Sequence, residues 1–350
     1  MRMEKEDRDG AFMRTALTQA RLGLGQTSPN PAVGAVLVVD DRIVARGHHR
    51  RAGLPHAEIE CLRQITKPIS QKATLYVTLE PCSTSGRTAP CTTAIIEAGV
   101  RNLVIGALDP NPRHSGRGIE VLRKAGIKVR SGVLEGECAQ LNESFNKWIQ
   151  TGLPFVIAKC GMSLDGRLTG LPSEGPWLTS PASRRHAQAL RSQVDAILVG
   201  AETVRADDPR LTVRGLRRAK QPWRIVLSRS GSLPRRSRIL TDRFSARTLI
   251  YREILHLGRL LRDLGAREIT SILIEGGGDI LGQALDQSII DKVQLYLAPI
   301  FTGGPIVAFG GTGGNSTSEA AKLERVRYER IGPDVCITGY PAYTLIPNKS

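Results

Sequence analysis

Short runs of β-branched and apolar residues alternate with helical stretches along most of this 350-residue chain. Residues 32–39 (AVGAVLVV) and 41–49 (DRIVARGHH) predict two strands that form a hairpin at Asp40-Asp41. Predicted helices and strands then alternate to about Trp148, and the alternation resumes in the second half. This order is typical of the α/β class, in which helices cover a mostly parallel sheet.

The length indicates more than one domain, because single hydrophobic cores stop growing at about 250–300 residues. The stretch Thr151-Gly152-Leu153-Pro154 interrupts the alternating pattern with residues that break helices and strands. We therefore predict two α/β domains, residues 1–150 and 151–350.

Composition excludes several classes of protein. No segment approaches about 18 consecutive apolar residues, so no membrane span is predicted. The charged N-terminus MRMEKEDRDGAF lacks the apolar region of a signal peptide. Six cysteines in 350 residues do not make a disulfide framework. Reduced thiols and a cytoplasmic location are the expectation.

The net charge of +16 is unevenly distributed. Residues 151–240 carry 16 basic and 6 acidic side chains, and eleven of the basic ones lie between Arg205 and Arg238. Such a block is compatible with nucleic-acid binding, with attraction of small phosphorylated ligands, or with a solvated loop surface. Aromatic residues make up only 4% of the chain, which leaves few stacking platforms for single-stranded nucleic acid.

Two short motifs in the first half carry chemistry. His56 and Glu58 lie two positions apart where a helix is predicted to begin, and Cys82 and Cys91 follow a predicted strand. The first motif alone is compatible with an ordinary helix start that exposes two polar side chains. One imidazole and two thiolates, however, make the three ligands that a catalytic zinc needs while one position stays open for water. H-x-E followed by P-C-x-x-C typifies zinc-dependent nucleobase deaminases, although the second spacer here has eight residues.

With that spacer, HAE and LEPCSTSGRTAPC resemble the deaminase domain of the bifunctional riboflavin-biosynthesis deaminase/reductase family, as do SPNPAVGAVLV and LDPNPRHSGRGIEVLRKAGI. The resemblance implies a cytidine-deaminase-like three-layer domain. It also implies Zn²⁺ on His56, Cys82 and Cys91, Glu58 as the proton shuttle, and deamination of a diaminopyrimidinone ribosyl phosphate. Thr84 and Ser85 depart from the family, which commonly has His after the Cys-Ser pair.

The second half contains the glycine-rich segment ILIEGGGDILGQAL at 272–285. Glycines between a strand and a helix let backbone N–H groups approach a phosphate, but they also serve as ordinary turn and cap residues. The spacing is not the G-x-G-x-x-G of a dinucleotide fingerprint. This segment, with KCGMSLDGRL, PWLTSPASRRHAQALRS and AILVGAETVRADDPRLTVR, resembles the reductase half of the same family. The resemblance implies a dihydrofolate-reductase-like fold and NADPH as cofactor.

Site residues of the reductase half are carried over from the resemblance. The implied NADPH site consists of Gly161, Trp177, Thr203, Asp207, Gly277, Gly278, Asp279, Ile280, Leu281, Gly282 and Gln283. The implied substrate site consists of Gly175, Arg191, Leu211, Arg214 and Glu275. Lys159 and Asp165 are further candidate polar contacts. Arg229 departs from the family, which more often has a small polar pair there.

The sequence therefore predicts a bifunctional enzyme that uses Zn²⁺ and NADPH and acts on a small phosphorylated pyrimidine. We expect a cytoplasmic homo-oligomer with no nucleic-acid or membrane partner. Three alternatives stay open: a nucleic-acid-base deaminase with a basic RNA-binding half, a protein with one active domain, and a scaffold clipped by a structural zinc. His48 and His49 are the nearby candidates for the fourth ligand that a structural site requires.

Overall fold

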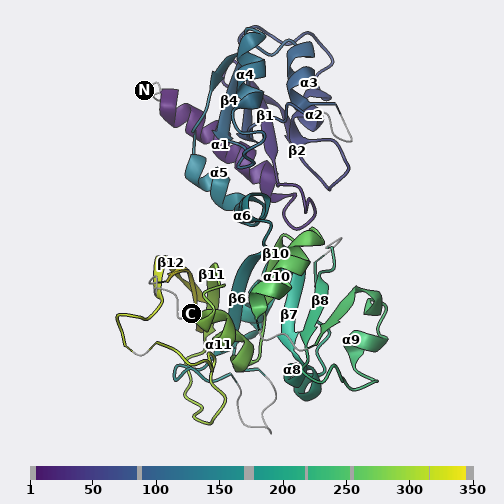
Figure 1. The fold of residues 1–350 in the computed structure, drawn as a ribbon. Coiled ribbons are helices and arrows are strands. Elements are labelled where there is room, and N and C mark those ends of the chain that lie inside the picture. The colour runs from purple at the N-terminus through teal and green to yellow at the C-terminus, as the bar shows by residue number, and fades with distance from the viewer. Residues whose placement is uncertain are drawn as a thin grey trace. The chain divides into compact units, whose positions relative to one another are not determined.

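A computed structural model describes residues 5–84, 89–168, 177–216, 220–252, 256–314 and 316–343. The chain divides into two compact units, Met1–Gly152 and Leu153–Ser350, and each contains a sheet covered by helices (Figure 1). None of the described helices combines the length and the apolar composition needed to cross a bilayer.

The first unit has a five-stranded sheet of order β2-β1-β3-β4-β5. Its strands are β1 (Gly34–Val39), β2 (Arg42–His48), β3 (Thr74–Leu79), β4 (Asn102–Ala107) and β5 (Lys128–Arg130). β1 is antiparallel to β2 and β3, whereas β3, β4 and β5 are parallel. The hairpin predicted at Asp40-Asp41 is confirmed: both residues have positive φ, 47° and 61°, as a two-residue type I′ turn requires.

Within the described part of this unit, six helices cover both faces of the sheet. They are α1 (Lys5–Arg21), α2 (Ala57–Leu62), α3 (Cys91–Glu97), α4 (Arg117–Lys124), α5 (Glu135–Leu141) and α6 (Glu143–Thr151). α1 packs on β1 and β3 and contacts α5, which packs on β4. α2 packs on β1 and β2, α3 contacts α2 and α4, and α4 packs on β5. The result is a three-layer arrangement.

The core of the first unit follows from helical and strand periodicity. α1 buries Met13, Ala16, Leu17 and Ala20, which share one face of the helix. The alternation predicted to continue to about Trp148 ends in two helices, α5 and α6, with a break between them at Asn142. The Asn142 side chain donates to the Ala32 carbonyl (2.9 Å) and accepts from the Ala32 N–H (2.8 Å), so a contact distant in sequence interrupts the helix.

The second unit has an eight-stranded sheet of order β12-β13-β11-β6-β10-β7-β8-β9. Its strands are β6 (Phe155–Met162), β7 (Ala196–Gly200), β8 (Trp223–Leu227), β9 (Thr248–Tyr251), β10 (Ser271–Ile274), β11 (Lys292–Leu297), β12 (Lys322–Ile331) and β13 (Asp334–Ala342). The six strands from β11 to β9 are parallel, and β13 and β12 extend the sheet as an antiparallel hairpin. The sequence pattern does not predict this hairpin.

Helices cover both faces of the second sheet as well. They are α7 (Pro181–Arg191), α8 (Ala201–Asp207), α9 (Arg238–Thr241), α10 (Leu257–Ala266) and α11 (Gly278–Asp286), with a 3₁₀ turn at Ser245–Arg247. Residues of α10 and α11 share one apolar cluster, and residues of α7, α8 and α9 share another. β6 alternates between the two, with Val156 and Ala158 in the first and Phe155 and Ile157 in the second. α8 and α11 begin just after β7 and β10, at the carboxyl edge of the parallel strands.

Candidate active sites

Three sequence-predicted ligands of the first unit lie together. His56 is the residue immediately before α2, Cys91 is the first residue of α3, and Cys82 lies in the turn after β3. His56 Nδ1 is 3.7 Å from Cys82 Sγ and 3.3 Å from Cys91 Sγ. The three ligand atoms all lie within 4.8 Å of one another. Two helix starts and one strand end therefore bring the predicted ligands into a single cluster.

The electrostatics of this cluster favour an ionised Cys82 thiol beside His56. The hydrogen bond from Cys91, together with those from His56 and the Cys91 N–H, lowers the pKa of Cys82 to about 4. The same contact with Cys82 raises the pKa of Cys91, so the two thiols share one proton. The hydrogen bond to Cys82 raises the pKa of His56. Cys82 thus carries a negative charge that a cation would neutralise.

Glu58 completes the site. It lies in the first turn of α2, is 3% exposed, and has one carboxyl oxygen, Oε2, with no hydrogen-bond partner. Burial raises the pKa of Glu58, which makes it a group that can hold or release a proton. The imidazole nitrogen and the two thiol sulfurs of the cluster are ligands that zinc prefers, and a three-ligand zinc site keeps one position open. The unpartnered, buried Glu58 oxygen beside them fits such a site.

The described residues offer no fourth protein ligand. The metal-capable group contains His56, Cys82 and Cys91, and neither His48 nor His49 belongs to it. His49 instead bonds to the Pro55 carbonyl (3.1 Å) and contacts the His56 ring edge to face, with centroids 5.1 Å apart. A three-ligand set is the arrangement of catalytic rather than structural zinc. Thr84 is exposed, and Ser85 lies outside the described residues.

A buried acid next to the cluster was not predicted from sequence. Glu80 is 5% exposed and directly precedes Pro81-Cys82. Its carboxyl group accepts from the N–H groups of Asp109, Gly116, Gly118 and Ile119, at 2.9 to 3.4 Å. Glu80 thereby ties the end of β3 to the start of α4. Gly116 and Gly118 lie 36 and 38 residues after Glu80 in the chain. No local sequence pattern therefore predicts that they contact it.

The second unit contains a cavity of about 840 Å³ at the carboxyl edge of its parallel strands. Predicted site residues that line it are Lys159, Gly161, Trp177, Arg191, Thr203, Asp207, Arg214, Glu275, Gly277, Gly278 and Asp279. Residues that line it without having been predicted include Thr179, Ser183, Arg184, Tyr296 and Val307. A volume of this size suits a cofactor together with a small substrate.

Other predicted residues do not line this cavity. Ile280 and Leu281 are buried in the core, Gly282 packs against the Gly311 backbone, and Gln283 is exposed on α11. Leu211 is buried with a positive φ of 48°. Asp165 accepts hydrogen bonds from the N–H groups of Thr302 and Gly303. Gly175 lies outside the described residues.

Arg191 and Glu275 form a buried ion pair in the cavity wall. Arg191 Nε donates to Glu275 Oε1 at 2.7 Å, and Arg191 Nη2 contacts Oε2. Burial opposes ionisation of Glu275, but the charge and hydrogen bonds of Arg191 outweigh it and lower the pKa of Glu275. Arg191 also donates to the Thr212 carbonyl (3.3 Å). A fixed pair of opposite charges can orient a polar ligand.

The glycine turn before α11 leaves the cavity wall open to a phosphate. Gly276 and Gly277 have φ of 154° and 78°, and a Cβ on either would point at Thr203, 3.6 to 3.8 Å from its side chain. These glycines lead into the nine-residue α11, and the Thr203 hydroxyl lies beside them. This cradle fits the pyrophosphate of a dinucleotide.

Fold and sites together define a two-domain enzyme in which a deaminase-type metal site and a cavity of cofactor size belong to separate units. The cytidine and deoxycytidylate deaminase zinc-binding region matches residues 6–107, and the RibD C-terminal domain matches residues 154–337. The riboflavin biosynthesis protein RibD of Aquifex aeolicus is 38% identical, over 94% of this chain and 97% of its own. That of Escherichia coli is also 38% identical, over 94% and 98%.

Solved structures agree. RibD of Acinetobacter baumannii superposes with a TM-score of 0.89 at 35% identity, covering 97% of this chain and 100% of its own. A Thermotoga maritima protein described as a diaminohydroxyphosphoribosylaminopyrimidine deaminase / 5-amino-6-(5-phosphoribosylamino)uracil reductase has a TM-score of 0.87 at 34% identity, covering 96% and 99%. This chain belongs to the RibD family, the bifunctional deaminase/reductase enzymes of riboflavin biosynthesis.

The predicted fold class is confirmed. The first unit is a cytidine-deaminase-like domain, and the second is a RibD reductase domain built on a mixed sheet. The predicted enzyme class is confirmed as well, because both the zinc-binding deaminase region and the reductase domain are present in one chain. The alternative of a nucleic-acid-base deaminase with an RNA-binding half is not favoured.

Proposed function

We propose that residues 1–150 deaminate 2,5-diamino-6-(5-phosphoribosylamino)pyrimidin-4(3H)-one and that residues 151–350 reduce the ribosyl side chain of the product to ribityl. The observation that carries the proposal is the three-ligand cluster with the unpartnered Glu58 oxygen beside it, in a chain whose other unit holds the glycine-lined cavity. The T. maritima relative, covered over 99% of its length, is described by these two activities.

In the first unit, His56, Cys82 and Cys91 would hold Zn²⁺. Zinc, when bound, acidifies water and so makes a nucleophile available near neutral pH. Glu58 would take a proton from the attacking water and deliver it to the amino group that leaves as ammonia. Its burial suits both steps, because a raised pKa lets the carboxyl group hold the proton between them. His49, braced by the Pro55 carbonyl, would keep the His56 ring in place.

In the second unit, the cofactor would lie along the carboxyl edge of the sheet. NADPH, when bound, supplies the hydride that reduces C1 of the opened ribose. The N–H groups at Gly277, Gly278 and Asp279 would bind its pyrophosphate, and Thr203 would contact it from α8. Gly161, Trp177 and Asp207, which line the same cavity, would complete the cofactor site.

The substrate would occupy the end of the cavity nearer Arg191. The ion pair with Glu275 holds the Arg191 guanidinium in one orientation, and Arg214 adds a second positive charge in the lining. Arginine binds phosphate through paired hydrogen bonds, so these residues suit the ribosyl phosphate. Leu211 lies three residues before Arg214 and is buried outside the cavity lining, so it would position Arg214 rather than contact the substrate itself. Homo-oligomerisation stays a prediction of the resemblance, and a cytoplasmic location stays a prediction of the composition.

The test follows both reactions in one sample. Purified protein is incubated with the diaminopyrimidinone ribosyl phosphate and NADPH, and ammonia release and NADPH absorbance are recorded separately with and without a zinc chelator. We expect ammonia first and NADPH oxidation second, with both lost after chelation. When the deaminated product is supplied instead, NADPH oxidation should survive chelation.

Each other outcome contradicts a part of the proposal. Ammonia without NADPH oxidation would leave the first unit as a lone deaminase. Deamination that persists after complete zinc removal, verified by metal analysis, would refute the metal role of His56, Cys82 and Cys91. Absence of both signals would refute the substrate and return attention to a nucleic-acid base.

A further inference from the structure

An irregular segment after β11, residues 300–313, forms part of the wall of the reductase cavity. We call this segment the strap, and its residues 305–307 line the cavity. The strap lies against the first turn of α11. The Gly310 N–H donates to the Gly278 carbonyl (3.0 Å), and a Cβ on Gly278 would lie 2.0 Å from the Val307 carbonyl oxygen. The lining part of the strap therefore adjoins the glycine turn to which we assign the cofactor's pyrophosphate.

The loop that follows β6, residues 163–168, pairs with the strap through its backbone. The Leu168 N–H donates to the Ile306 carbonyl (3.1 Å), and the Ala308 N–H donates to the Gly166 carbonyl (2.9 Å). Leu168 and Ile306 both line the cavity. Loop and strap together make an apolar wall against which a bound ligand can pack.

The carboxyl group of Asp165, in this loop, fixes the start of the strap. It accepts hydrogen bonds from the N–H groups of Thr302 (3.2 Å) and Gly303 (2.8 Å). We call this contact of one carboxylate with two consecutive N–H groups a clasp. Hydrogen bonds from Ser163 and from these two N–H groups lower the pKa of Asp165 to about 2, so the clasp is charge-assisted at neutral pH.

A second aspartate clasps the other end of the strap in the same way. Asp286, the last residue of α11, accepts from the N–H groups of Thr312 (2.7 Å) and Gly313 (3.0 Å). The two clasps have the same chemistry but different places in the strap. Gly303 lies two residues before the lining segment 305–307, whereas Thr312 lies five residues after it. The Asp165 clasp is therefore the nearer anchor of the wall.

Packing separates the second clasp from the wall but not the first. Between the Asp286 clasp and the wall, the strap backbone lies tightly on α11, since a Cβ on Gly282 would be 2.2 Å from the Gly311 nitrogen. Gly304, between the first clasp and the wall, has open space. No atom of the described chain, apart from its sequence neighbours, would lie within 4 Å of a Cβ there. Loosening at Asp165 would thus reach the wall, and loosening at Asp286 would stop at α11.

We propose that Asp165 is a positioning residue of the reductase, which clasps the start of the strap and so holds the apolar wall in place for NADPH. The inference rests on the proposed reductase function. NADPH is the ligand affected because Val307, in the wall, lies against Gly278, in the turn assigned to the pyrophosphate. A wall that is fixed before binding spares the ligand the cost of ordering it, so the clasp raises affinity without touching the cofactor.

The test compares two substitutions that remove the same hydrogen bonds at different distances from the wall. Asp165→Asn and Asp286→Asn each replace a carboxylate that accepts two N–H groups by an amide with one acceptor oxygen. Calorimetry measures NADPH affinity, and NADPH absorbance gives kcat and both KM values with the deaminated substrate. We expect Asp165→Asn to weaken NADPH binding and raise its KM about tenfold, with kcat and the pyrimidine KM near wild type. Asp286→Asn should change NADPH affinity by no more than about twofold.

Two further measurements separate positioning from folding. Thermal unfolding followed by circular dichroism should show both Asn variants folded, with similar losses in midpoint, because each loses the same bonds. Asp165→Glu, which keeps the charge, should bind NADPH more tightly than Asp165→Asn does.

Each contrary result overturns a defined statement. Equal losses of NADPH affinity in the two Asn variants, or no loss in Asp165→Asn, would mean that the clasps serve the fold alone. A loss confined to the pyrimidine substrate would overturn the assignment of the wall to NADPH. In both cases the wild-type enzyme still oxidises NADPH, so the reductase function stands. A wild-type protein that neither binds nor oxidises NADPH would refute the proposed reductase function itself.

Discussion

Arg224 and Asp242 form a two-pronged ion pair beneath the surface of the reductase domain. Arg224 Nη1 lies 2.8 Å from Asp242 Oδ2, Nη2 lies 3.0 Å from Oδ1, and the Arg224 side chain is 1% exposed. The same guanidinium donates to the carbonyls of Arg210 (3.2 Å) and Ile239 (2.9 Å). One side chain on β8 therefore holds both α9 and the segment after α8, which leads to Leu211 and Arg214.

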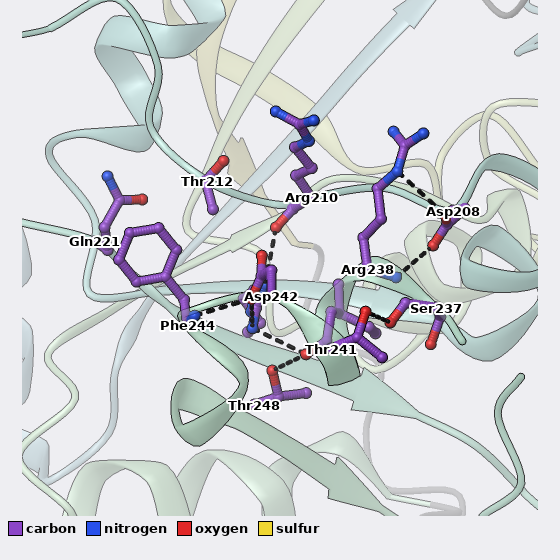
Figure 2. Close-up of polar contacts among 12 residues, drawn as sticks. Asp208, Arg210, Thr212, Gln221, Ser237, Arg238, Thr241, Asp242, Phe244 and Thr248 are labelled. Atoms are coloured by element: carbon purple, nitrogen blue, oxygen red, sulfur yellow. Dashed lines mark hydrogen bonds and ion pairs between the residues drawn. The ribbon is translucent and has the colours of Figure 1, made fainter. Parts of the chain in front are cut away.

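Replacing Arg224 should destabilise the second unit. Arg224→Lys keeps the charge but loses the paired geometry and at least one carbonyl contact. We expect the free energy of unfolding to fall by about 2 kcal/mol, less than for a fully buried pair because Asp242 is 25% exposed. Arg210→Lys is the control, because Arg224 contacts only the backbone carbonyl of Arg210. Figure 2 shows the Arg210 side chain pointing away from Asp242. Urea unfolding of both variants measures the difference, and equal stabilities would contradict the role of the pair.

The same pair makes stability depend on pH. Burial acts to raise the pKa of Asp242, but the hydrogen bonds and charge of Arg224 outweigh it and hold that pKa below its ordinary value of 3.8. Between the folded and unfolded values the unfolded chain binds more protons, so the contribution is complete above about pH 4 and is lost as pH falls through the lower, folded value. The stability gap between wild type and Asp242→Asn should be constant from about pH 7 to 5 and shrink below pH 4. A gap that widens toward acid would contradict this sign.

Local rules explain which parts of the fold the sequence predicts. The hairpin at Asp40-Asp41 and the helix ends at Gly99 and Gly126, with φ of 77° and 81°, depend on residue types that tolerate positive φ. Ser180 caps α7 by accepting the Ser183 N–H at 3.4 Å, as its position before Pro181 predicts. These features need no information beyond a few neighbouring residues.

Long-range contacts explain what the sequence does not predict. The break between α5 and α6 depends on Ala32, 110 residues before Asn142. Exposed residues of β12 do not alternate with buried ones. Its sequence KLERVRYERI therefore lacks the apolar-polar alternation that identifies a strand. The grouping of His56, Cys82 and Cys91 was predictable, because the chemistry that these residues share is encoded in their types and spacing. The pairing of Arg191 with Glu275 could not be predicted, because the two residues are 84 positions apart, although each was predicted as a site residue.

Neutralising Glu275 should impair the reductase while deamination continues. Glu275→Gln leaves the Arg191 guanidinium largely buried without its counter-charge and free to shift in the cavity wall. We expect a loss of about 2 kcal/mol in unfolding free energy and at least a tenfold higher KM for the pyrimidine substrate of reduction. Ammonia release should stay at the wild-type rate. Arg267→Gln, which removes an exposed ion pair at 53% exposure, is the control and should change neither quantity. An unaltered KM would refute the substrate-orienting role of the pair.

Glu58→Gln should separate metal binding from deamination. The substitution preserves shape but removes the group that accepts and returns the proton, so deamination should fall by about 10² to 10⁴-fold. Zinc content should remain near one per chain, since His56, Cys82 and Cys91 are unchanged. NADPH oxidation with the deaminated substrate should be unaffected, which shows that the variant is folded. Deamination at the wild-type rate would assign the proton transfer to another group.

Glu80→Gln tests how the protein positions Cys82. The buried Glu80 carboxyl group accepts hydrogen bonds from three backbone N–H groups at the start of α4 and from that of Asp109, just after β4. Glutamine at this position would turn its NH₂ group toward N–H groups that need an acceptor. We therefore expect the free energy of unfolding to fall by about 2 kcal/mol. Zinc affinity should fall about tenfold, because the end of β3 that leads to Cys82 loses its anchor. Glu120→Gln, an exposed change in the first turn of α4, is the matched control. Metal competition titrations with a chelator measure the affinity. If Glu80→Gln binds zinc as tightly as Glu120→Gln does, the anchor serves the fold alone and Cys82 is held by the cluster itself.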